Sequence, residues 1–357
     1  MPGPARSRAA HLIHALNSTS VPLSESRAAA LAAEHFGLVA TATRLSSERD
    51  QNFRMEDGSG NCFVLKVSSP AEAPEVTNLQ TMALLHVAKT DPELPVPQVF
   101  PARNGAVELD LAVDDGPARI MRLLSYLPGL PLHQATASLA LCRDLGRRAA
   151  QLGRALQNFH HPAACYPLLW DLQHAGQLRP LLDEIEGLSA EDYRFLAGVL
   201  DGFASRIAPA LPRLRQQLVH NDLNPNNVMV NPADHTRVSG ILDFGDMTRT
   251  ALINDVAIAA TYQVGSGDNL LEPVAALVAG YHAIVPLEET ELDILFDLIV
   301  IRSAMTVVIG GWRAARHPEN RGYILRHAPG AWSRLRYLMR VPAERVRVEL
   351  RRACNMD

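Results

Sequence analysis

The sequence predicts an α+β protein made of two lobes. Strand-like segments and one amphipathic helix occupy residues 38–124, and helical patterns dominate from residue 133 to residue 357. The stretch "SYLPGLPL" at 125–132 lies between them, and its Pro and Gly residues break both patterns. We therefore expect a small mixed α/β N-lobe, a hinge at 125–132 and a larger, mainly helical C-lobe, preceded by a helical segment at 1–37. A chain of 357 residues is long enough to give each lobe its own core.

The composition excludes several classes of protein. Hydrophobic residues make up 47% and charged residues 20%, which is typical of a soluble globular protein. A net charge of −4 gives no general attraction to nucleic acid or to anionic membranes. The four Cys residues form no C-x-x-C pair, which argues against a zinc site or a disulfide framework and favours a reducing, cytoplasmic location.

No segment predicts secretion or a membrane span. The N-terminus has no continuous apolar stretch of the kind that a signal peptide needs. The most apolar run, residues 294–309, is interrupted by Asp297 and Arg302 and is too short to cross a bilayer. We expect this run to be a buried helix, and we expect neither a membrane nor a nucleic acid as a partner.

In the small lobe, two strands at 51–56 and 62–67 flank "DGSGN", a hairpin signal. A helix should start at Pro74, because Pro fits the first helical position. Two further strands are expected at 106–112 and 118–124. One face of the helix carries a stripe at helical spacing, with Gln80 as its only polar member: Val76, Leu79, Gln80, Ala83 and Val87.

In the large lobe, helical patterns cover 139–160 and 190–217. Two short strands, "VMV" and "VSGILDF", follow and are joined by "NPADHT". After "DFGDMTRTALIND" the pattern turns directly helical and stays so to the end of the chain. The large lobe therefore reads as helices around one small hairpin.

The stretch "LVHNDLNPNNVMVN" at 218–231 is poor in helix and strand formers before Val228 and predicts a loop. It carries His220, Asp222 and Asn227 in the spacing H-x-D-x-x-x-x-N, and Asp243 opens an Asp-Phe-Gly triplet after the next apolar strand. A surface turn would also use Asn, Asp and Pro. The ordered combination of the two motifs favours a functional loop.

Phosphoryl transfer is the chemistry that these residue types serve. It needs a carboxylate to orient the acceptor hydroxyl, oxygen ligands for Mg²⁺ and a cation on the phosphates. Asp222 suits the first task as the catalytic residue, and Asn227 and Asp243 suit the second as metal ligands. Lys66, at the end of the strand "CFVLKV", suits the third. The order Lys, Asp-x-x-x-x-Asn, Asp-Phe-Gly matches the kinase signature set.

With these motifs the chain resembles the aminoglycoside phosphotransferase/choline kinase superfamily, whose fold resembles that of protein kinases. The loop "VHNDLNPNNVMV" is similar to the superfamily's His-Gly-Asp-x-x-x-x-Asn loop, with Asn221 where Gly is usual. Within the superfamily the chain most resembles the hydroxylysine kinase-like group. The strings that carry this likeness include "SSERDQNF" (46–53), "MRLLSYLPGLPL" (121–132) and "NDVAIAATY" (254–262).

The resemblance implies a bilobal protein-kinase-like fold that binds Mg²⁺ and a nucleotide donor. GTP is as plausible a donor as ATP, because hydroxylysine kinase uses GTP. The acceptor it implies is a hydroxyl on a small amine-bearing, cationic or zwitterionic metabolite. 5-Hydroxylysine or a similar hydroxyamino acid is the first expectation, and homoserine, choline, ethanolamine and aminoglycosides are the alternatives.

The resemblance also assigns nucleotide-binding residues. In kinases a Glu on the helix after the Lys strand pairs with the Lys. Here Gln80 takes the inward position and is our expected partner for Lys66, with Glu75 as the alternative. The phosphate-covering loop "LSSERDQNF" is not Gly-rich and could be an ordinary turn. The remaining candidates cover the phosphates or lie against the base: Ser46, Ser47 and Arg49 from the loop, and Ser125, Tyr126 and Leu127 from the linker.

Two residues are expected to support the catalytic loop. In kinases the His of this loop is a buttress, so we assign His220 to structure rather than to catalysis. Asp255 should accept hydrogen bonds from backbone N–H groups of the loop, and it could equally cap the helix "VAIAATY".

The acceptor site is less defined by the sequence. Asp246 is a candidate for binding a substrate ammonium group or else an exposed loop residue. Trp170 and Asp171 form a substrate wall or belong to the core. Arg302 lies in an apolar helix, where an unpaired charge is costly. It either pairs with Asp297 or Asp255 or binds a substrate carboxylate.

Two other classes of function stay open. A non-catalytic nucleotide- or metabolite-binding module is compatible with Gln80 and Asn221, but it would not need Asp222. A protein kinase is disfavoured because no activation segment ending in Ala-Pro-Glu follows Asp243. The oligomeric state is not encoded in any pattern that we can read.

Overall fold

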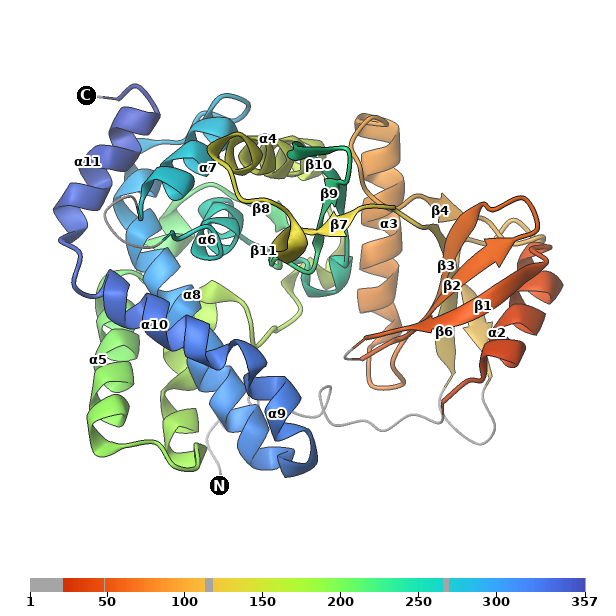
Figure 1. Ribbon diagram of the computed structural model, residues 1–357, viewed down its shortest axis with the longest axis horizontal. Coiled ribbons are helices and arrows are strands. Elements are labelled where there is room, and N and C mark those ends of the chain that lie inside the picture. Colours follow the sequence, from red (N-terminus) through yellow and green to blue (C-terminus); the bar gives the residue numbers. More distant parts are fainter. Residues whose placement is uncertain (1–21, 48, 113–117, 266–269, 357) are drawn as a thin grey trace. The chain divides into compact units, whose positions relative to one another are not determined.

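The computed structural model (Figure 1) describes residues 22–47, 49–112, 118–265 and 270–356. The predicted helical segment at 1–37 therefore lies mostly outside the described residues. The chain forms two compact units, which we describe separately. Unit 1 comprises Met1–Gly129, Phe159–Pro167 and Ser239–Gly245, and unit 2 comprises Leu130–Asn158, Leu168–Val238 and Asp246–Asp357.

Unit 1 is built on one antiparallel sheet in the order β1-β2-β3-β6-β4, with β5 also paired to β6. The predicted hairpin is present, with Glu56 opposite Cys62 next to the turn. The strands are β1 (Ala40–Leu45), β2 (Gln51–Asp57), β3 (Cys62–Val67), β4 (Val99–Phe100), β5 (Leu109–Leu111) and β6 (Arg119–Ser125).

Helices lie on both faces of this sheet (Figure 1). On one face α2 (Glu25–Leu31) packs over alternate strand residues, which include Phe53, Leu65 and Met121. On the other face lies α3 (Pro74–Thr90), which starts at Pro74 as predicted. Because side chains alternate along a strand, Lys66 points away from the core that holds Leu65, toward the α3 face.

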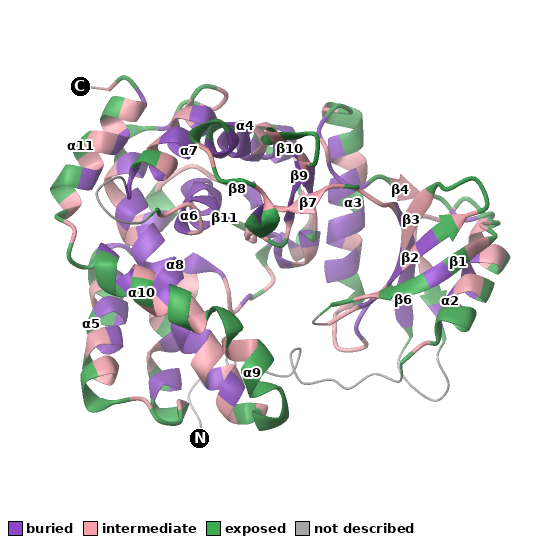
Figure 2. Cartoon of the chain, viewed as in Figure 1, coloured by how far each residue is buried: buried purple, intermediate pink, exposed green. Residues whose placement is uncertain are grey.

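Unit 2 is mainly helical, and α8 runs through it (Figure 2). This helix contains the apolar run 294–309, and its middle is buried, which confirms the predicted buried helix. The helices are α4 (Leu139–Leu156), α5 (Ala190–Arg206), α6 (Ile253–Thr261), α7 (Glu272–His282), α8 (Glu289–Arg316), α9 (Arg321–Ile324), α10 (Ala328–Leu338) and α11 (Ala343–Ala353).

Two helices of unit 2 touch through glycines. A Cβ on Gly146 of α4 would lie 2.0 Å from the carbonyl oxygen of Leu277 in α7, and one on Gly280 of α7 would lie 2.0 Å from the carbonyl oxygen of Arg143. Only residues without a Cβ allow this backbone approach.

Short strands carry the polar loop. β7 (Leu130–Pro131) and β10 (Asp234–Ile241) flank β9 (Val228–Asn231) in one small sheet. β8 (Gln216–Val219), just before the loop, pairs with β11 (Thr248–Ala251). The strand β11 lies inside "DFGDMTRTALIND", where no strand was predicted, and the helix expected at the end of that stretch begins at Ile253.

Two predicted helices are shorter than expected. One or two helices were predicted over 190–217, but α5 ends at Arg206, and Pro209 and Pro212 follow, which cannot continue a helix without losing hydrogen bonds. The helix predicted at 139–160 ends at Leu156. None of the helices in the described part of the chain combines the length and apolar character that crossing a membrane would need.

Candidate active site

Lys66 lies near the end of β3 and is 9% exposed. Its Nζ lies 3.1 Å from Oδ2 of Asp50 and 3.5 Å from Oδ1 of Asp243. Burial alone would lower the pKa of Lys66, but the carboxylates of Asp243 and Asp50 outweigh it and raise the pKa above its ordinary value. The ammonium is therefore charged at neutral pH.

The expectation that Gln80 pairs with Lys66 is wrong. The buried Gln80 accepts a hydrogen bond from Nη2 of Arg122 at 2.9 Å and donates one to Oε1 of Glu72 at 3.3 Å. The alternative, Glu75, is exposed. A neutral amide fits between these two charges because it accepts from one and donates to the other, which a carboxylate could not do.

The predicted phosphate loop lies between β1 and β2. Ser46 and Ser47 are exposed and Arg49 is half-buried. Nη2 of Arg49 lies 3.7 Å from where a Cβ on Gly245 would be, so Arg49 lies beside the Asp-Phe-Gly triplet. In the described part of the loop, the hydroxyls of Ser46 and Ser47 and the guanidinium of Arg49 are groups that can bind phosphate oxygens.

The linker residues differ in what their backbone offers. Ser125 donates its N–H to the carbonyl of Gln98 at 2.9 Å, and Tyr126 donates its N–H to the carbonyl of Cys62 at 3.3 Å. Both amides are therefore used inside unit 1. Of the three predicted contacts to a nucleotide base, Leu127 is the one for which no such bond competes among the described residues.

The predicted catalytic loop lies in unit 2 and is held by Asp255. Its two carboxylate oxygens accept the backbone N–H groups of His220, at 3.0 Å, and of Asn221, at 2.7 Å. These are the bonds that the sequence predicted. Burial raises the pKa of Asp255 above its ordinary value, although His220 and the backbone donors oppose this shift.

His220 is fully buried, and its Nδ1 accepts the N–H of Asp222 at 3.3 Å. Asn221 adopts a left-handed backbone with φ 64°. Asn tolerates this region better than most residues, which explains why it can stand where Gly is usual.

Both oxygens of the Asp222 carboxylate have partners. Oδ1 accepts Nη2 of Arg302 at 3.1 Å. Oδ2 accepts Nδ2 of Asn227 at 2.8 Å and Nδ2 of Asn224 at 2.9 Å. The side chain is 20% exposed, so a carboxylate fixed at both ends still reaches the surface of unit 2.

The predicted metal ligands suit Mg²⁺ in their donor atoms. Asn227 directs Nδ2 to the carbonyl and the carboxylate of Asp222, which leaves its Oδ1 to act as a ligand. Asp243 has φ 58° and a side chain that is 53% exposed. Within the described residues no group of three His, Cys, Asp or Glu side chains could hold a metal. Mg²⁺ needs few protein ligands when phosphates and water supply the rest.

Arg302 has a different acid partner from either that was predicted. It pairs with Asp222, donates Nη1 to the carbonyl of Trp170 at 3.2 Å and stacks 4.7 Å from the centre of that ring. Asp297 lies five residues earlier, and at 3.6 residues per turn the two side chains are about 140° apart around the helix. Asp255 instead holds the backbone of the catalytic loop.

The other substrate candidates are mostly buried. Asp171 is 1% exposed, accepts the N–H of Gln173 at 3.1 Å and accepts the hydroxyl of Thr250 at 3.4 Å. Burial raises its pKa. Asp171 therefore acts as a helix cap in this structure, which favours the core alternative. Asp246 is 8% exposed rather than an exposed loop residue, and Trp170 is half-buried.

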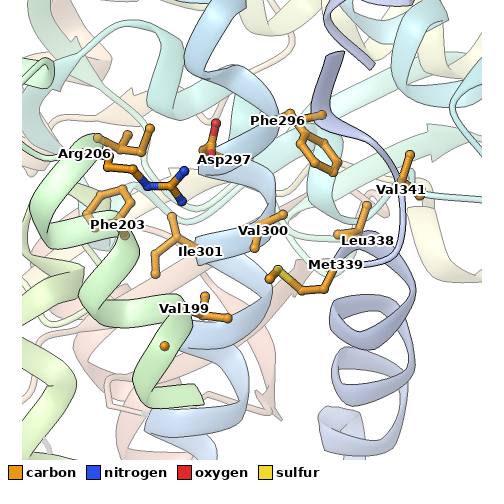
Figure 3. Close-up of a pocket in the computed structure, with 13 residues that line it drawn as sticks. Val199, Phe203, Arg206, Phe296, Asp297, Val300, Ile301, Leu338, Met339 and Val341 are labelled. Carbon is orange, nitrogen blue, oxygen red and sulfur yellow. The ribbon is translucent and has the colours of Figure 1, made fainter. Parts of the chain in front are cut away.

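A separate cavity of about 210 Å³ lies in unit 2 (Figure 3). Its walls are mainly apolar, and Asp297 of α8 and Arg206 of α5 face each other there. Burial raises the pKa of Asp297, although the nearby Arg206 and Arg347 oppose this. None of the predicted site residues lines this cavity, so it is distinct from the candidate active site.

Sequence reasoning missed two parts of the site. In the sequence Asp50 is one of several charged residues in an apparent turn. In the structure its side chain is only 10% exposed and lies against Lys66. The pairing of Arg302 with Asp222 joins residues 80 positions apart. The one available signal was an arginine in an apolar helix, which indicates a buried partner without naming it.

Comparisons with known proteins identify the family of this chain. The model of the family described as "Phosphotransferase enzyme family" matches residues 41–292. Hydroxylysine kinase from Mus musculus is 28% identical over 339 residues, which cover 88% of this chain and 89% of that protein. Homoserine kinase from Methylobacillus flagellatus is 27% identical over 241 residues, with 64% of this chain and 66% of that protein covered.

Among solved structures, a microcompartment-associated aminopropanol kinase superposes with a TM-score of 0.67 at 22% identity, covering 86% of this chain and 96% of that one. This likeness confirms the predicted α+β, kinase-like fold. Since the family model spans well over half of the chain, the protein belongs to the phosphotransferase enzyme family and is a small-molecule kinase.

Proposed function

We propose that the protein transfers the γ-phosphoryl group of ATP or GTP to a hydroxyl of a small amine-bearing metabolite, with 5-hydroxylysine or a similar hydroxyamino acid as the first candidate. The observation that carries the proposal is the Asp222 carboxylate, held by Arg302 on one oxygen and by Asn227 on the other. The similarity to hydroxylysine kinase over most of both chains supports this choice of acceptor.

Each residue has a proposed task. Asp222 orients the acceptor hydroxyl and takes its proton as the oxygen bonds to the γ-phosphorus, while the bond from that phosphorus to the β,γ-bridging oxygen breaks and the nucleoside diphosphate leaves. Lys66 donates hydrogen bonds to phosphate oxygens, and Ser46, Ser47 and Arg49 cover them. Asn227 and Asp243 would hold Mg²⁺, which neutralises charge on the phosphates when bound. These tasks require positioning and electrostatics rather than covalent chemistry from the protein.

The positioning of Asp222 has a physical basis in unit 2. The guanidinium of Arg302 favours the ionised carboxylate and fixes its rotation together with Asn224 and Asn227. Asp255 fixes the backbone that carries it. We propose that Arg302 acts mainly on Asp222 rather than on a substrate carboxylate, because both of its terminal nitrogens already have partners. Asp246 and Trp170 remain our candidates for the amine-bearing acceptor.

The first test is turnover with Mg²⁺ against hydroxylysine, homoserine, choline, ethanolamine and kanamycin, each with ATP and with GTP. Asp222→Asn should lower acceptor-dependent kcat by roughly 10²- to 10⁴-fold, which is the rate enhancement that a general base usually provides. Asp234→Asn is the matched control, because Asp234 is an exposed acid of the neighbouring strand β10. Equal activity in the two variants would remove Asp222 from the mechanism.

Two alternatives give different results in the same assay. Turnover with homoserine in preference to hydroxylysine would assign homoserine as the acceptor. The similarity to homoserine kinase is the reason for including this compound. Tight nucleotide binding without turnover on any acceptor would favour the non-catalytic binding module.

A further inference from the structure

We infer that Asp50 is the residue that positions Lys66 for the nucleotide phosphates, in place of a residue on helix α3. The inference rests on the proposed nucleotide-binding role of Lys66. Asp50 Oδ2 lies 3.1 Å from Nζ of Lys66, and the two side chains are only 10% and 11% exposed. A contact this shielded from water is far less weakened by solvent and salt than a surface ion pair.

The two carboxylate oxygens of Asp50 have different partners. Oδ1 accepts the backbone N–H of Ser69, just beyond β3, at 2.9 Å, while Oδ2 faces Lys66. The hydrogen bond to the backbone fixes the carboxylate, so the carboxylate can fix the ammonium. Asp50 therefore has the fixed orientation that a residue needs in order to position Lys66.

Helix α3 offers no competing acid in this structure. Gln80 bridges Glu72 and Arg122, and Glu75 is exposed. Arg122 stands opposite Lys66 across strands β3 and β6, and its positive charge works against that of Lys66. The Asp50 carboxylate offsets this repulsion on the Lys66 side.

The position of Asp50 couples two parts of the nucleotide site. Asp50 follows Ser46, Ser47 and Arg49 in the predicted phosphate loop, so the ion pair ties that loop to Lys66. A lysine ammonium has three donors, and the carboxylates of Asp50 and Asp243 account for two of them among the described residues. The third can serve a phosphate oxygen without breaking the pair.

Removing the Asp50 carboxylate should change the position of the Lys66 ammonium, which a simple loss of side-chain packing would not do. Among the described residues, Lys66 would keep the more exposed Asp243 at 3.5 Å as its ion-pair partner, with the carboxylate of Glu72 as a further nearby negative charge. We expect the ammonium to move toward Asp243, which is a proposed metal ligand. Lys66 would then leave the phosphates and compete with Mg²⁺ for the same carboxylate.

The test is a double-mutant cycle with Asp50→Asn, Lys66→Ala and the combined variant. Asp50→Asn is isosteric and keeps an acceptor for Ser69. We would measure the Kd for the Mg²⁺ complexes of ATP and GTP, the kcat with the best acceptor, and the Mg²⁺ concentration for half-maximal activity. Asp110→Asn, an exposed acid on β5, is the matched control. Thermal unfolding of each variant checks that it folds.

We expect Asp50→Asn to lower kcat and weaken nucleotide binding, each by about 10- to 100-fold, the loss that a misplaced group causes. The Mg²⁺ requirement should rise, and Asp50→Glu should restore part of the activity. In the Lys66→Ala background the Asp50 change should add less than about twofold, since a residue acting only through Lys66 has nothing left to position.

The outcomes separate this inference from the proposed function. A wild-type enzyme that turns over while Asp50→Asn matches Asp110→Asn overturns the inference and leaves the function standing. Fully additive losses in the combined variant overturn it as well. If none of the acceptors supports turnover, the inference is tested by the double-mutant cycle of nucleotide Kd values without the kinetic data. A wild-type protein that binds neither nucleotide overturns both.

Discussion

Arg302 and Asp222 form an ion pair in which the guanidinium is almost fully buried and the carboxylate reaches the surface of unit 2. The same guanidinium donates to the carbonyl of Trp170, so one planar group fixes the proposed catalytic aspartate and a backbone segment together. Burial alone would lower the pKa of Arg302, but the nearby Tyr262, Asp222 and Asp246 outweigh it and raise the pKa. The guanidinium therefore stays charged at any working pH.

Arg302→Lys should lower kcat while leaving the KM for the acceptor within about threefold. Lysine keeps the charge but cannot donate to Asp222 and to Trp170 with one rigid fork, so Asp222 is less well oriented. We expect the loss in kcat to be about 10- to 100-fold. Steady-state kinetics with varied acceptor checks this, with Arg336→Lys on the exposed face of α10 as control. A raised KM at unchanged kcat would instead assign Arg302 to a substrate carboxylate.

Asn221→Gly should be tolerated and Asn221→Ala should not. Asn221 has φ 64°, and its buried amide has no hydrogen-bond partner among the described residues. Gly adopts this backbone freely and removes the unpaired amide, while Ala strains it by about 1–2 kcal/mol. The free energy of unfolding from urea titration should differ between the two variants by that amount. Equal stabilities would contradict a backbone role for this position.

Gln80→Leu should destabilise the protein by about 1–3 kcal/mol, because it removes the hydrogen bond that Nη2 of Arg122 donates to Gln80 and the one that Gln80 donates to Oε1 of Glu72. Since Gln80 does not contact Lys66, we expect kcat to change little in comparison. Denaturant unfolding together with kcat measures the two effects separately. A large fall in kcat at unchanged stability would return Gln80 to the nucleotide site.

Asp171→Asn should become relatively more favourable as the pH rises. Burial raises the pKa of Asp171 in the folded state, so the folded protein holds this proton more strongly than the unfolded chain does. The stabilisation is complete below the unfolded pKa and is lost as the pH rises through the folded pKa. Asn caps a helix as well as Asp does and has no proton to lose.

The measurement for Asp171 is the free energy of unfolding of both proteins at several pH values between about 4 and 7. The difference, variant minus wild type, should increase with pH. Parallel curves would mean that Asp171 ionises in the folded protein as easily as in the unfolded chain.

The parts of the fold that could be predicted from the sequence depend on neighbours along the chain. The Asp-Gly hairpin before β3 and the Pro74 start of α3 follow from local backbone preferences. The bonds of Asp255 to the catalytic loop followed from the kinase-like order of motifs. The false extension of α5 came from following hydrophobic periodicity through Pro209 and Pro212, although both residues disfavour a helix.

The parts that could not be predicted depend on contacts between distant segments. The pairing of β11 with β8 leaves no local signal, because short strands are specified by their partners as much as by their own residues. The same holds for Asp50, since nothing in "SSERDQNF" distinguishes a buried acid from a solvated one. The partner of Arg302 required the three-dimensional structure for the same reason.

The strand β11 begins at Thr248, so only residues 244–247 separate it from Asp243. In signalling kinases the chain after this aspartate is long, and a modification there switches the enzyme on by ordering it. Here the chain enters a strand almost at once and has no segment at this place to order. Activation by ordering a long segment, as in signalling kinases, therefore has no structural basis at this position.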